Sequence, residues 1–471
     1  MVAQLTSFRL PQGFRISWFF ASIAAVAAAV LFFLPPPEGA PPGLMRAAGV
    51  VVLAIGLWAT SAVPEYYTTL VFFFLAMAFG IAPANVVFSG FHSGAIWMVL
   101  GGLVIGAAVQ ATGLGRRVAE RLVGRTQGTY FQTIFGIVLI AMLLSFFMPS
   151  ATGRVVIILP IVLAVAERMG FQRGSNGYIA MALAVGAGTL HPGFAILPAG
   201  VPNLGLMGAA ESLYGIRLIF GEYLFLVFPV IGVVTTLILP VLLCRLFPDT
   251  VRGSAAGEVP AGITGPERKL ALILVVALAL WITDFWHGIA PAWIAIGASI
   301  LCLAPRTGII PTVSLVSKIN LGPWFFVAGI VGMGAVVVNS GLGNAVAQWL
   351  FRWVDMTPGN DALNYAIVVA LGGIMGLVTS MPGQPGIMSA LAENISQATG
   401  WPIQTVLMAQ VPSWLLALFP YQLPPIVATI ALARLPMAAV VRFLVCLAAF
   451  SGFVTAPLLF LWWRLIGFMG G

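Results

Sequence analysis

Charged residues are scarce in this chain, and that scarcity excludes a soluble protein. Of 471 residues only 7% are charged, whereas 61% are hydrophobic. A soluble domain has about 25% charged residues, so this composition cannot cover a surface that faces water. Apolar runs long enough to cross about 30 Å of hydrocarbon recur along the whole length. We therefore predict an all-α integral membrane protein, with membrane lipid as its solvent.

Cysteine and histidine are also rare, and no catalytic motif is present. The three cysteines lie far apart in apolar stretches without metal-ligand spacing. The three histidines are scattered, and the sequence has no HExxH motif, nucleophile elbow or phosphate-binding loop. The net charge of +8 fits cytoplasmic loops that collect Arg and Lys better than a nucleic-acid partner. We expect no enzyme activity and no cofactor.

The apolar segments predict about eleven membrane spans. The first is too long for a typical signal-peptide core, so we predict a membrane helix. Arg9 and Arg15 precede it and place its start in the cytoplasm. Only the stretch from Asp249 to Lys269 has the composition of a soluble linker. The predicted spans are approximately 16–34, 47–63, 67–83, 94–113, 175–198, 219–244, 269–286, 290–304, 321–350, 404–432 and 437–463.

Two further apolar stretches, roughly 128–167 and 363–398, are interrupted by the helix breakers MPSATG (148–153) and MPGQPG (381–386). Each arm is too short to span the membrane, so we predict two re-entrant hairpins. Many arginines surround the base of the first hairpin, but only Arg352 lies near the second. The positive-inside rule then places the first base in the cytoplasm and the second outside.

An internal repeat also indicates two halves of inverted topology. Gly113 and Leu114 recur as Gly341 and Leu342, the two breakers correspond, and broken stretches at 191–203 and 419–425 occupy matching places. Such halves are typical of an alternating-access transporter. The predicted units are an N-terminal helix and turn at 1–46, a first repeat at 47–248, a cytoplasmic linker at 249–268 and a second repeat at 269–471.

The breakers are the first candidates for a binding site. Irregular backbone at membrane depth is tolerated only where protein or a water-filled cavity satisfies its polar groups. Freed N–H groups favour an anion, and freed carbonyls and hydroxyls can hold a cation. The alternative is that these residues only kink helices. The candidates are Ser150, Thr152, Gly153, Gly383, Gln384 and Gly386.

Arg154 and His191 are ionisable residues beside these breaks. An arginine at membrane depth is costly and marks a functional hypothesis. Arg154 could form a bidentate contact with a carboxylate, sulfonate or sulfate; alternatively, it reaches water or bonds a backbone carbonyl. His191 could carry a proton, or it merely satisfies a backbone group.

Several segments resemble the divalent anion:sodium symporters, a family of dicarboxylate, citrate and sulfate carriers. The resemblance covers nearly the whole chain after about residue 47. LWATSAVPEYYTTL at 57–70 is similar to the family's W-x-T-E-x-x-P-x-x-x-T segment, and LSFFMPSATGRVVIILPI at 144–161 to the segment with its first Ser-Asn-Thr signature. GVPNLGLMG at 200–208 and FPYQLPPI at 419–426 are similar to its two T-P-P-N segments.

The resemblance implies an anion held between two hairpin tips that are flanked by sodium sites. It also implies a homodimer that moves its substrate by an elevator motion. The implied substrate positions are Ser150, Ala151, Thr152, Gly383, Gln384, Pro385, Pro202, Asn203, Pro424 and Pro425. The implied sodium positions lie near Ser145, Ser150, Ala199, Thr379 and Gln422.

The departures from the family leave the coupling ion open between Na⁺, H⁺ and exchange. Ala151 and Gln384 replace the signature asparagines, and Ser61 replaces the family's acidic residue. Arg154 stands where the family usually has a small residue, and it could restore charge complementarity to an anion.

We therefore expect a secondary transporter of a small anion in a bacterial-type plasma membrane. The substrate would be a di- or tricarboxylate, sulfate or sulfonate. A cation/proton antiporter is the first alternative, but it needs an acidic residue at membrane depth, and Glu65, Glu393 and Asp284 all fall near predicted helix ends. A membrane enzyme would need clustered polar residues at one interface, and a channel would lack the inverted hairpins.

Overall fold

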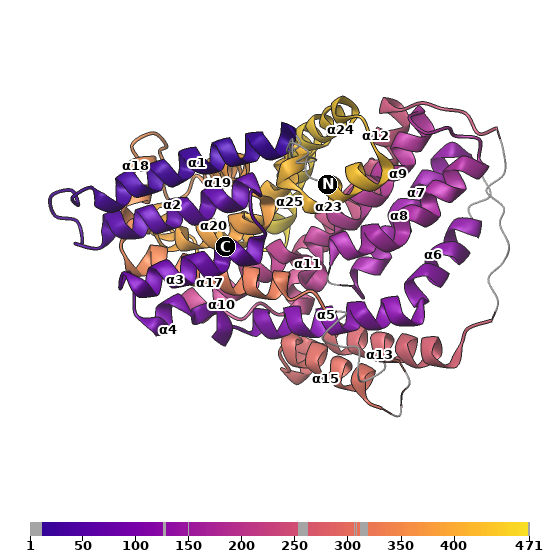
Figure 1. Cartoon of the computed structure of the whole chain (residues 1–471), viewed down its shortest axis with the longest axis horizontal. Helices are drawn as coiled ribbons and strands as arrows, with labels where there is room; N and C mark the ends of the chain where they lie inside the picture. Colours follow the sequence, from indigo (N-terminus) through magenta and orange to yellow (C-terminus); the bar gives the residue numbers. More distant parts are fainter. Residues whose placement is uncertain are drawn as a thin grey trace, which may run out of the picture.

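The computed structural model describes residues 12–125, 129–148, 150–252, 262–305, 307, 309–310 and 319–469 (Figure 1). Every regular element in these ranges is helical. Pro149 of the first breaker, residues 253–261 of the predicted linker and Arg9 lie outside the described residues. Among the described residues, 6 helices have the length and composition to cross a membrane: Gly94–Thr112, Asn176–Ala195, Phe220–Leu246, Gly322–Asn339, Asp361–Val378 and Met437–Leu465. Shorter apolar helices of 10–17 residues accompany them, and the predicted number of crossings stays a prediction.

The N-terminal helices pack closely on one another. The first helix covers the predicted first span, and Gly56 of the second is needed at their contact, because a Cβ there would lie 2.3 Å from the Cβ of Ala24. The third helix begins at Glu65, directly after Pro64. The bounds are α1 Gln12–Phe33, α2 Leu44–Thr60, α3 Glu65–Ala78 and α4 Ala84–Val87.

The predicted repeat is visible where each half turns from an apolar helix into an amphipathic one. Gly113 ends the first apolar helix with φ 76°, and Gly341 follows the second with φ 77°. Both values lie in the left-handed region, which glycine adopts without a steric penalty. This turn divides the predicted span 321–350 in two. The helices are α5 Gly94–Thr112 and α6 Leu114–Arg125 in the first half, and α17 Gly322–Asn339 and α18 Leu342–Leu350 in the second.

Both predicted hairpins fold back on themselves. At the first base, the ring of Tyr130 lies 5.6 Å from that of Phe171. At the second, Trp401 Nε1 donates a hydrogen bond of 2.8 Å to Asp361 Oδ1. Figure 1 places the two hairpins toward opposite ends of the long axis. Their helices are α7 Tyr130–Ser145 and α8 Ala151–Arg168, and then α19 Asp361–Val378, α20 Gln384–Ala390 and α21 Ala392–Thr399.

In each half, the short helix that follows the broken stretch packs against helices of the other half. The short helix of the first half packs on α17 and α20, and that of the second packs on α8 and its neighbour in the first half. Each hairpin is thereby held against a helix of the other half. The two short helices are α10 Val201–Tyr214 in the first half and α23 Pro424–Ala433 in the second, and α23 packs on α8 and α9. The helices that precede the broken stretches are α9 Asn176–Leu190 and α22 Ile403–Ala409.

A second sign of the repeat is a π-helical turn inside the long helix that ends each half. The turns are Phe228–Gly232 and Ser451–Thr455. The two long helices contact each other, since Trp463 Nε1 donates to the carbonyl of Leu226 at 2.9 Å. They comprise α11 Phe220–Val227 with α12 Val233–Leu246, and α24 Met437–Phe450 with α25 Ala456–Leu465.

The helices after the linker lie along α5 (Figure 1). Gly101 permits the approach, because a Cβ there would lie 2.8 Å from Ala295. Ser299 Oγ then donates to the Gly101 carbonyl at 2.9 Å. These helices are α13 Gly265–Ile282, α14 Asp284–His287 and α15 Pro291–Leu303.

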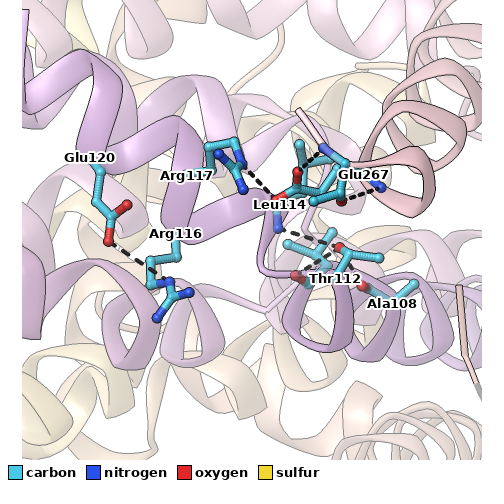
Figure 2. Close-up of polar contacts among 9 residues, drawn as sticks. Ala108, Thr112, Leu114, Arg116, Arg117, Glu120 and Glu267 are labelled. Carbon is cyan, nitrogen blue, oxygen red and sulfur yellow. Dashed lines mark hydrogen bonds and ion pairs between the residues drawn. The ribbon is translucent and has the colours of Figure 1, made fainter. Parts of the chain in front are cut away.

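A buried ion pair joins α6 to α13, as Figure 2 shows. Arg117 Nε lies 2.7 Å from Glu267 Oε1, and the Glu267 side chain is only 3% exposed. The other carboxylate oxygen of Glu267 accepts the Thr264 N–H at 2.7 Å, so the same residue caps α13. The Arg116–Glu120 pair beside it spans 3.8 Å and is solvent-exposed.

We expect Glu267→Ala to lower the free energy of unfolding by about 2–4 kcal/mol, because it removes the buried carboxylate of the ion pair with Arg117 and the cap of α13. Glu120→Ala should change it by less than about 1 kcal/mol, since exposed pairs contribute little. Thermal unfolding of the purified protein in detergent measures both. Equal effects of the two variants would contradict a structural role for the buried pair.

Candidate functional site

The tips of both hairpins and both proline segments meet around one cavity. Its volume is about 380 Å³. The cavity receives side chains from both halves of the chain, as expected for a site between two repeats. Its described lining consists of Glu65, Gln110, Ser150, Ala151, Thr152, Gly153, Val156, Leu190, Gly200, Val201, Pro202, Asn320, Pro323, Met381, Pro382, Leu423, Pro424 and Pro425.

A smaller cavity of about 160 Å³ adjoins the first. It runs along α5 and includes Gly102 and Gly106. The two glycines therefore border a hollow, and a Cβ added at Gly106 would meet no atom within 4 Å. The residues shared by both cavities are Gln110, Ser150, Gly153, Asn320 and Pro323.

The first tip presents the N-terminus of α8 to the larger cavity. Ser150 is the N-cap, and its Oγ accepts the Gly153 N–H at 3.1 Å. The other N–H groups of the first turn have no partner within the helix. Together with the helix dipole they favour an anion. Ser150, Ala151, Thr152 and Gly153 therefore lie where the sequence predicted a binding tip.

Arg154 lies behind this tip and outside the cavity lining. Its side chain is 0% exposed. Nη1 donates to the carbonyls of Met148 and Ala199, the latter at 3.0 Å, and Nη2 donates to that of Thr189 at 2.6 Å. Of the roles predicted for Arg154, the structure thus shows the bond to backbone carbonyls. The guanidinium joins the first tip to the broken segment 191–200.

Asn203 organises that broken segment from within. Its Nδ2 lies 3.3, 3.0 and 3.1 Å from the carbonyls of Gly193, Phe194 and Ile196. The Tyr223 hydroxyl donates to the Phe194 carbonyl at 2.7 Å. Pro202, one residue earlier, lines the cavity, whereas Asn203 is fully buried behind it.

We expect Asn203→Ala to lower the free energy of unfolding by about 2 kcal/mol, because it removes the buried hydrogen bonds that the Asn203 amide donates to carbonyls of the broken segment. Tyr223→Phe keeps the Asn203 contacts with the carbonyls, loses only those of the Tyr223 hydroxyl and should cost about 1 kcal/mol. Thermal unfolding with each variant measures the difference. If Asn203→Ala is as stable as the native protein, the segment is held by other contacts.

The second tip contributes less to the cavity than the first. Met381 and Pro382 line it, whereas Gln384 is fully buried and its Nε2 donates to Ser413 Oγ at 2.6 Å. The amide that replaces the family's asparagine thus faces a neighbouring segment. The signature positions behind the lining are Gly383, Gln384 and Pro385.

Gly386, another predicted site residue, serves close packing. A Cβ at this position would lie 2.5 Å from Ile330 Cγ2 and 3.0 Å from the Ile330 carbonyl. Only glycine therefore lets α20 approach α17 so closely. Its requirement for glycine comes from this contact.

Gln422 fixes the second proline segment. Its Oε1 accepts the N–H groups of Leu418 and Phe419, each at 2.9 Å. Its Nε2 donates to the Gly376 carbonyl at 2.5 Å. Pro424 and Pro425, just beyond, line the cavity as predicted positions.

The positions predicted to flank sodium already have hydrogen-bond partners within the chain. Ser145 Oγ donates to the Ala141 carbonyl and Thr379 Oγ1 to that of Met375, both at 3.0 Å. The Ala199 carbonyl accepts from Arg154. A sodium ion at these positions would have to share or displace these bonds.

Three polar residues of the lining, Glu65, Gln110 and Asn320, were not predicted from the sequence. Neither was Pro323, which lies in the first turn of α17. Glu65 was placed at a helix end, which is correct, but that end opens into the cavity. A carboxylate directly after Pro64 and before an apolar helix was the available signal. No motif indicated the other three, since each depends on contacts between distant elements.

Two other ionisable candidates have structural partners. His191 Nδ1 lies 3.2 Å from the Ala187 carbonyl, and its ring is 1% exposed and outside the cavity lining. Asp284 accepts the N–H groups of Phe220 and Gly221 at 2.6 and 3.1 Å, so it caps α11. The geometry therefore supports the alternative in which His191 only forms a hydrogen bond with a backbone carbonyl.

The fold has relatives among solved membrane transporters. The Alcanivorax borkumensis YdaH transporter is 17% identical, with 98% of this chain and 99% of that chain covered and a TM-score of 0.50. Neisseria gonorrhoeae MtrF is 13% identical, with 97% and 96% covered and a TM-score of 0.52. At these identities the likeness concerns the fold alone.

Sequence relatedness decides the family, because residues 16–469 match the family of the sodium:sulfate symporter transmembrane region. The chain belongs to this family. It is therefore a multi-pass integral membrane protein from a family of transporters, and the predicted resemblance and fold class are confirmed.

Several curated relatives are similar to this chain over part of their length. A sodium-dependent dicarboxylate transporter of Staphylococcus saprophyticus is 24% identical, covering 69% of this chain and 68% of its own. The L-tartrate/succinate antiporter of Escherichia coli is 25% identical over 54% of each chain. An inner membrane protein of Escherichia coli is 23% identical over 68% of this chain and 73% of its own.

Proposed function

We propose that this chain is a secondary active transporter of a small anion, either a di- or tricarboxylate, a sulfate or a sulfonate. The observation that carries the proposal is the cavity between the two hairpin tips, with the N-terminus of α8 in its wall. Free N–H groups and the positive end of the helix dipole favour anionic oxygens. The Arg154 guanidinium, just behind the tip, adds positive charge.

Within that cavity, Ser150 and Thr152 provide hydroxyls, and the first turn of α8 provides N–H donors. Pro202, Pro424 and Pro425 also line the cavity. The family membership and the names of the two relatives, one sodium-dependent and one an antiporter, support carboxylate or sulfate as the substrate class and leave both Na⁺ coupling and exchange as mechanisms.

The transport cycle would be an elevator-type alternating-access motion in a homodimer. Each hairpin is a continuous unit closed at its base, as a moving element requires. One hairpin with its partner helix would move across the remaining helices and carry the cavity with it. The bacterial inner membrane is the expected location.

The experiment is uptake by purified protein in proteoliposomes of radiolabelled succinate, citrate, sulfate, a sulfonate and a monocarboxylate. Each is run with a sodium gradient, a proton gradient or unlabelled anion inside. Saturable uptake of at least one dianion, competed by the unlabelled anion, is the expected result. If folded protein moves none of them under any condition, the substrate class is wrong.

One observation favours a second candidate, a cation/proton antiporter. Glu65 lines the cavity and supplies the acidic residue that such exchange needs. Cation-dependent proton release from proteoliposomes, with no anion requirement, would select this function over the first.

A further inference from the structure

Arg154 fills a cage of backbone carbonyls that come from three separate stretches of chain. Met148 precedes α8, Thr189 lies in the last turn of α9, and Ala199 belongs to the broken segment. The side chain is completely buried, and no ion pair among the described residues includes it. The cage therefore holds a full positive charge without an acidic partner.

Such a cage is a site for a cation. Carbonyls freed by broken helices, and the carbonyl end of a helix, carry partial negative charge and coordinate alkali cations in transporters. Gly193 makes room for the guanidinium, because a Cβ there would lie 3.3 Å from Nη2 and 3.7 Å from Ser145 Oγ. Among the described residues, the Nε atom has no hydrogen-bond partner, and the carbonyls of the cage contact Nη1 and Nη2 at the outer edge of the group.

We propose that Arg154 is a tethered cation, which occupies the carbonyl cage behind the first tip in place of a cotransported alkali ion. The inference rests on the proposed anion transport, because it states which positive charge accompanies the anion at this tip. Removing the guanidinium while leaving the carbonyls in place should make the cage a sodium site.

A tethered cation differs from a cotransported one in its effect on transport. It attracts the anion in both orientations of the transporter, but it returns with the protein and is not released. It therefore supports binding without contributing driving force. A transporter built this way is suited to exchanging one anion for another at this tip.

The test compares native protein with Arg154→Ser, in NaCl and in choline chloride at equal ionic strength. Arg154→Lys keeps a charge in the cage, and Arg168→Ser removes a charge from the exposed end of the same helix as the matched control. The first readout is thermal unfolding, which needs no substrate. The second is anion exchange in proteoliposomes.

We expect sodium to stabilise Arg154→Ser specifically, with a rise in its midpoint of at least about 4 °C that is absent from Arg154→Lys and Arg168→Ser. Its exchange should fall at least about tenfold in choline and recover with sodium. A folded Arg154→Ser whose unfolding and exchange respond to sodium as the native protein does overturns the inference, and so does a variant that unfolds whatever the cation. If native protein exchanges no anion, the proposed function fails, while the unfolding readout still tests the cage.

Discussion

Thr152→Trp is expected to abolish anion exchange, with a loss of at least about a hundredfold, while the protein stays folded. Thr152 lies in the first turn of α8, half-buried at the cavity wall. An indole at this position would project into the cavity of about 380 Å³ and cover the N–H groups of the helix terminus. Counterflow of a labelled anion in proteoliposomes measures the loss.

The matched control is Ala164→Trp, which adds the same side chain to an exposed position of the same helix. It should retain exchange within about twofold of the native rate, since it faces away from the buried core. If Thr152→Trp and Ala164→Trp transport equally well, the cavity is not the anion path.

Glu65→Gln is expected to remove most of the pH dependence of anion exchange. Glu65 is the only ionisable side chain among the described residues that line the cavity. At about 8 Å and an effective dielectric constant of about 20, an ionised carboxylate repels a dianion by about 4 kcal/mol. Native exchange should therefore rise as the pH falls and Glu65 takes up a proton.

The elements around Glu65 offer few other titratable groups. Helix α17 has none, and Arg46 lies in the first turn of α2, about 20 Å along the helix from the Thr60 end. Tyr66, Tyr67 and His92 are exposed, and Lys318 lies outside the described residues. Glu38→Gln, at an exposed turn, is the matched control and should keep the native profile. A Glu65→Gln protein that also keeps it would place the responsible group elsewhere.

The energetics of transport connect Glu65 with Arg154. Moving a dianion inward against an inside-negative potential costs roughly 4–5 kcal/mol per 100 mV. The charge on Arg154 returns with the transporter and cannot offset that cost. A proton on Glu65 that travels inward with the anion would offset about half of it.

The architecture could be predicted largely because its signals are local. Breakers within apolar runs predicted both hairpins, and the recurring Gly-Leu pair predicted the turns at Gly113 and Gly341. The π-helical turns after Val227 and Phe450 carry no comparable sequence signal, since Pro229 and Gly452 also fit ordinary helix kinks.

The site was only half predictable, because its remaining parts depend on long-range contacts. The sequence showed that a buried Arg154 is energetically costly. Whether its guanidinium binds an anion or backbone carbonyls depended on Thr189 and Ala199, which lie 35 and 45 residues away. Gln384 was assigned to the site by its place in a signature, whereas Ser413 fixes it behind the tip. The sequence identified which residues are unusual, and the fold decides which of them face the cavity.

The most direct test of an anion cavity between the hairpin tips is the reactivity of Thr152→Cys in a background without Cys244, Cys302 and Cys446. A membrane-impermeant thiol reagent is applied to each side of sealed vesicles in turn. We predict labelling from both sides, as the cavity alternates, and protection by the transported anion but not by a monovalent control. Labelling from one side only, or labelling unchanged by any transported anion, would contradict the account.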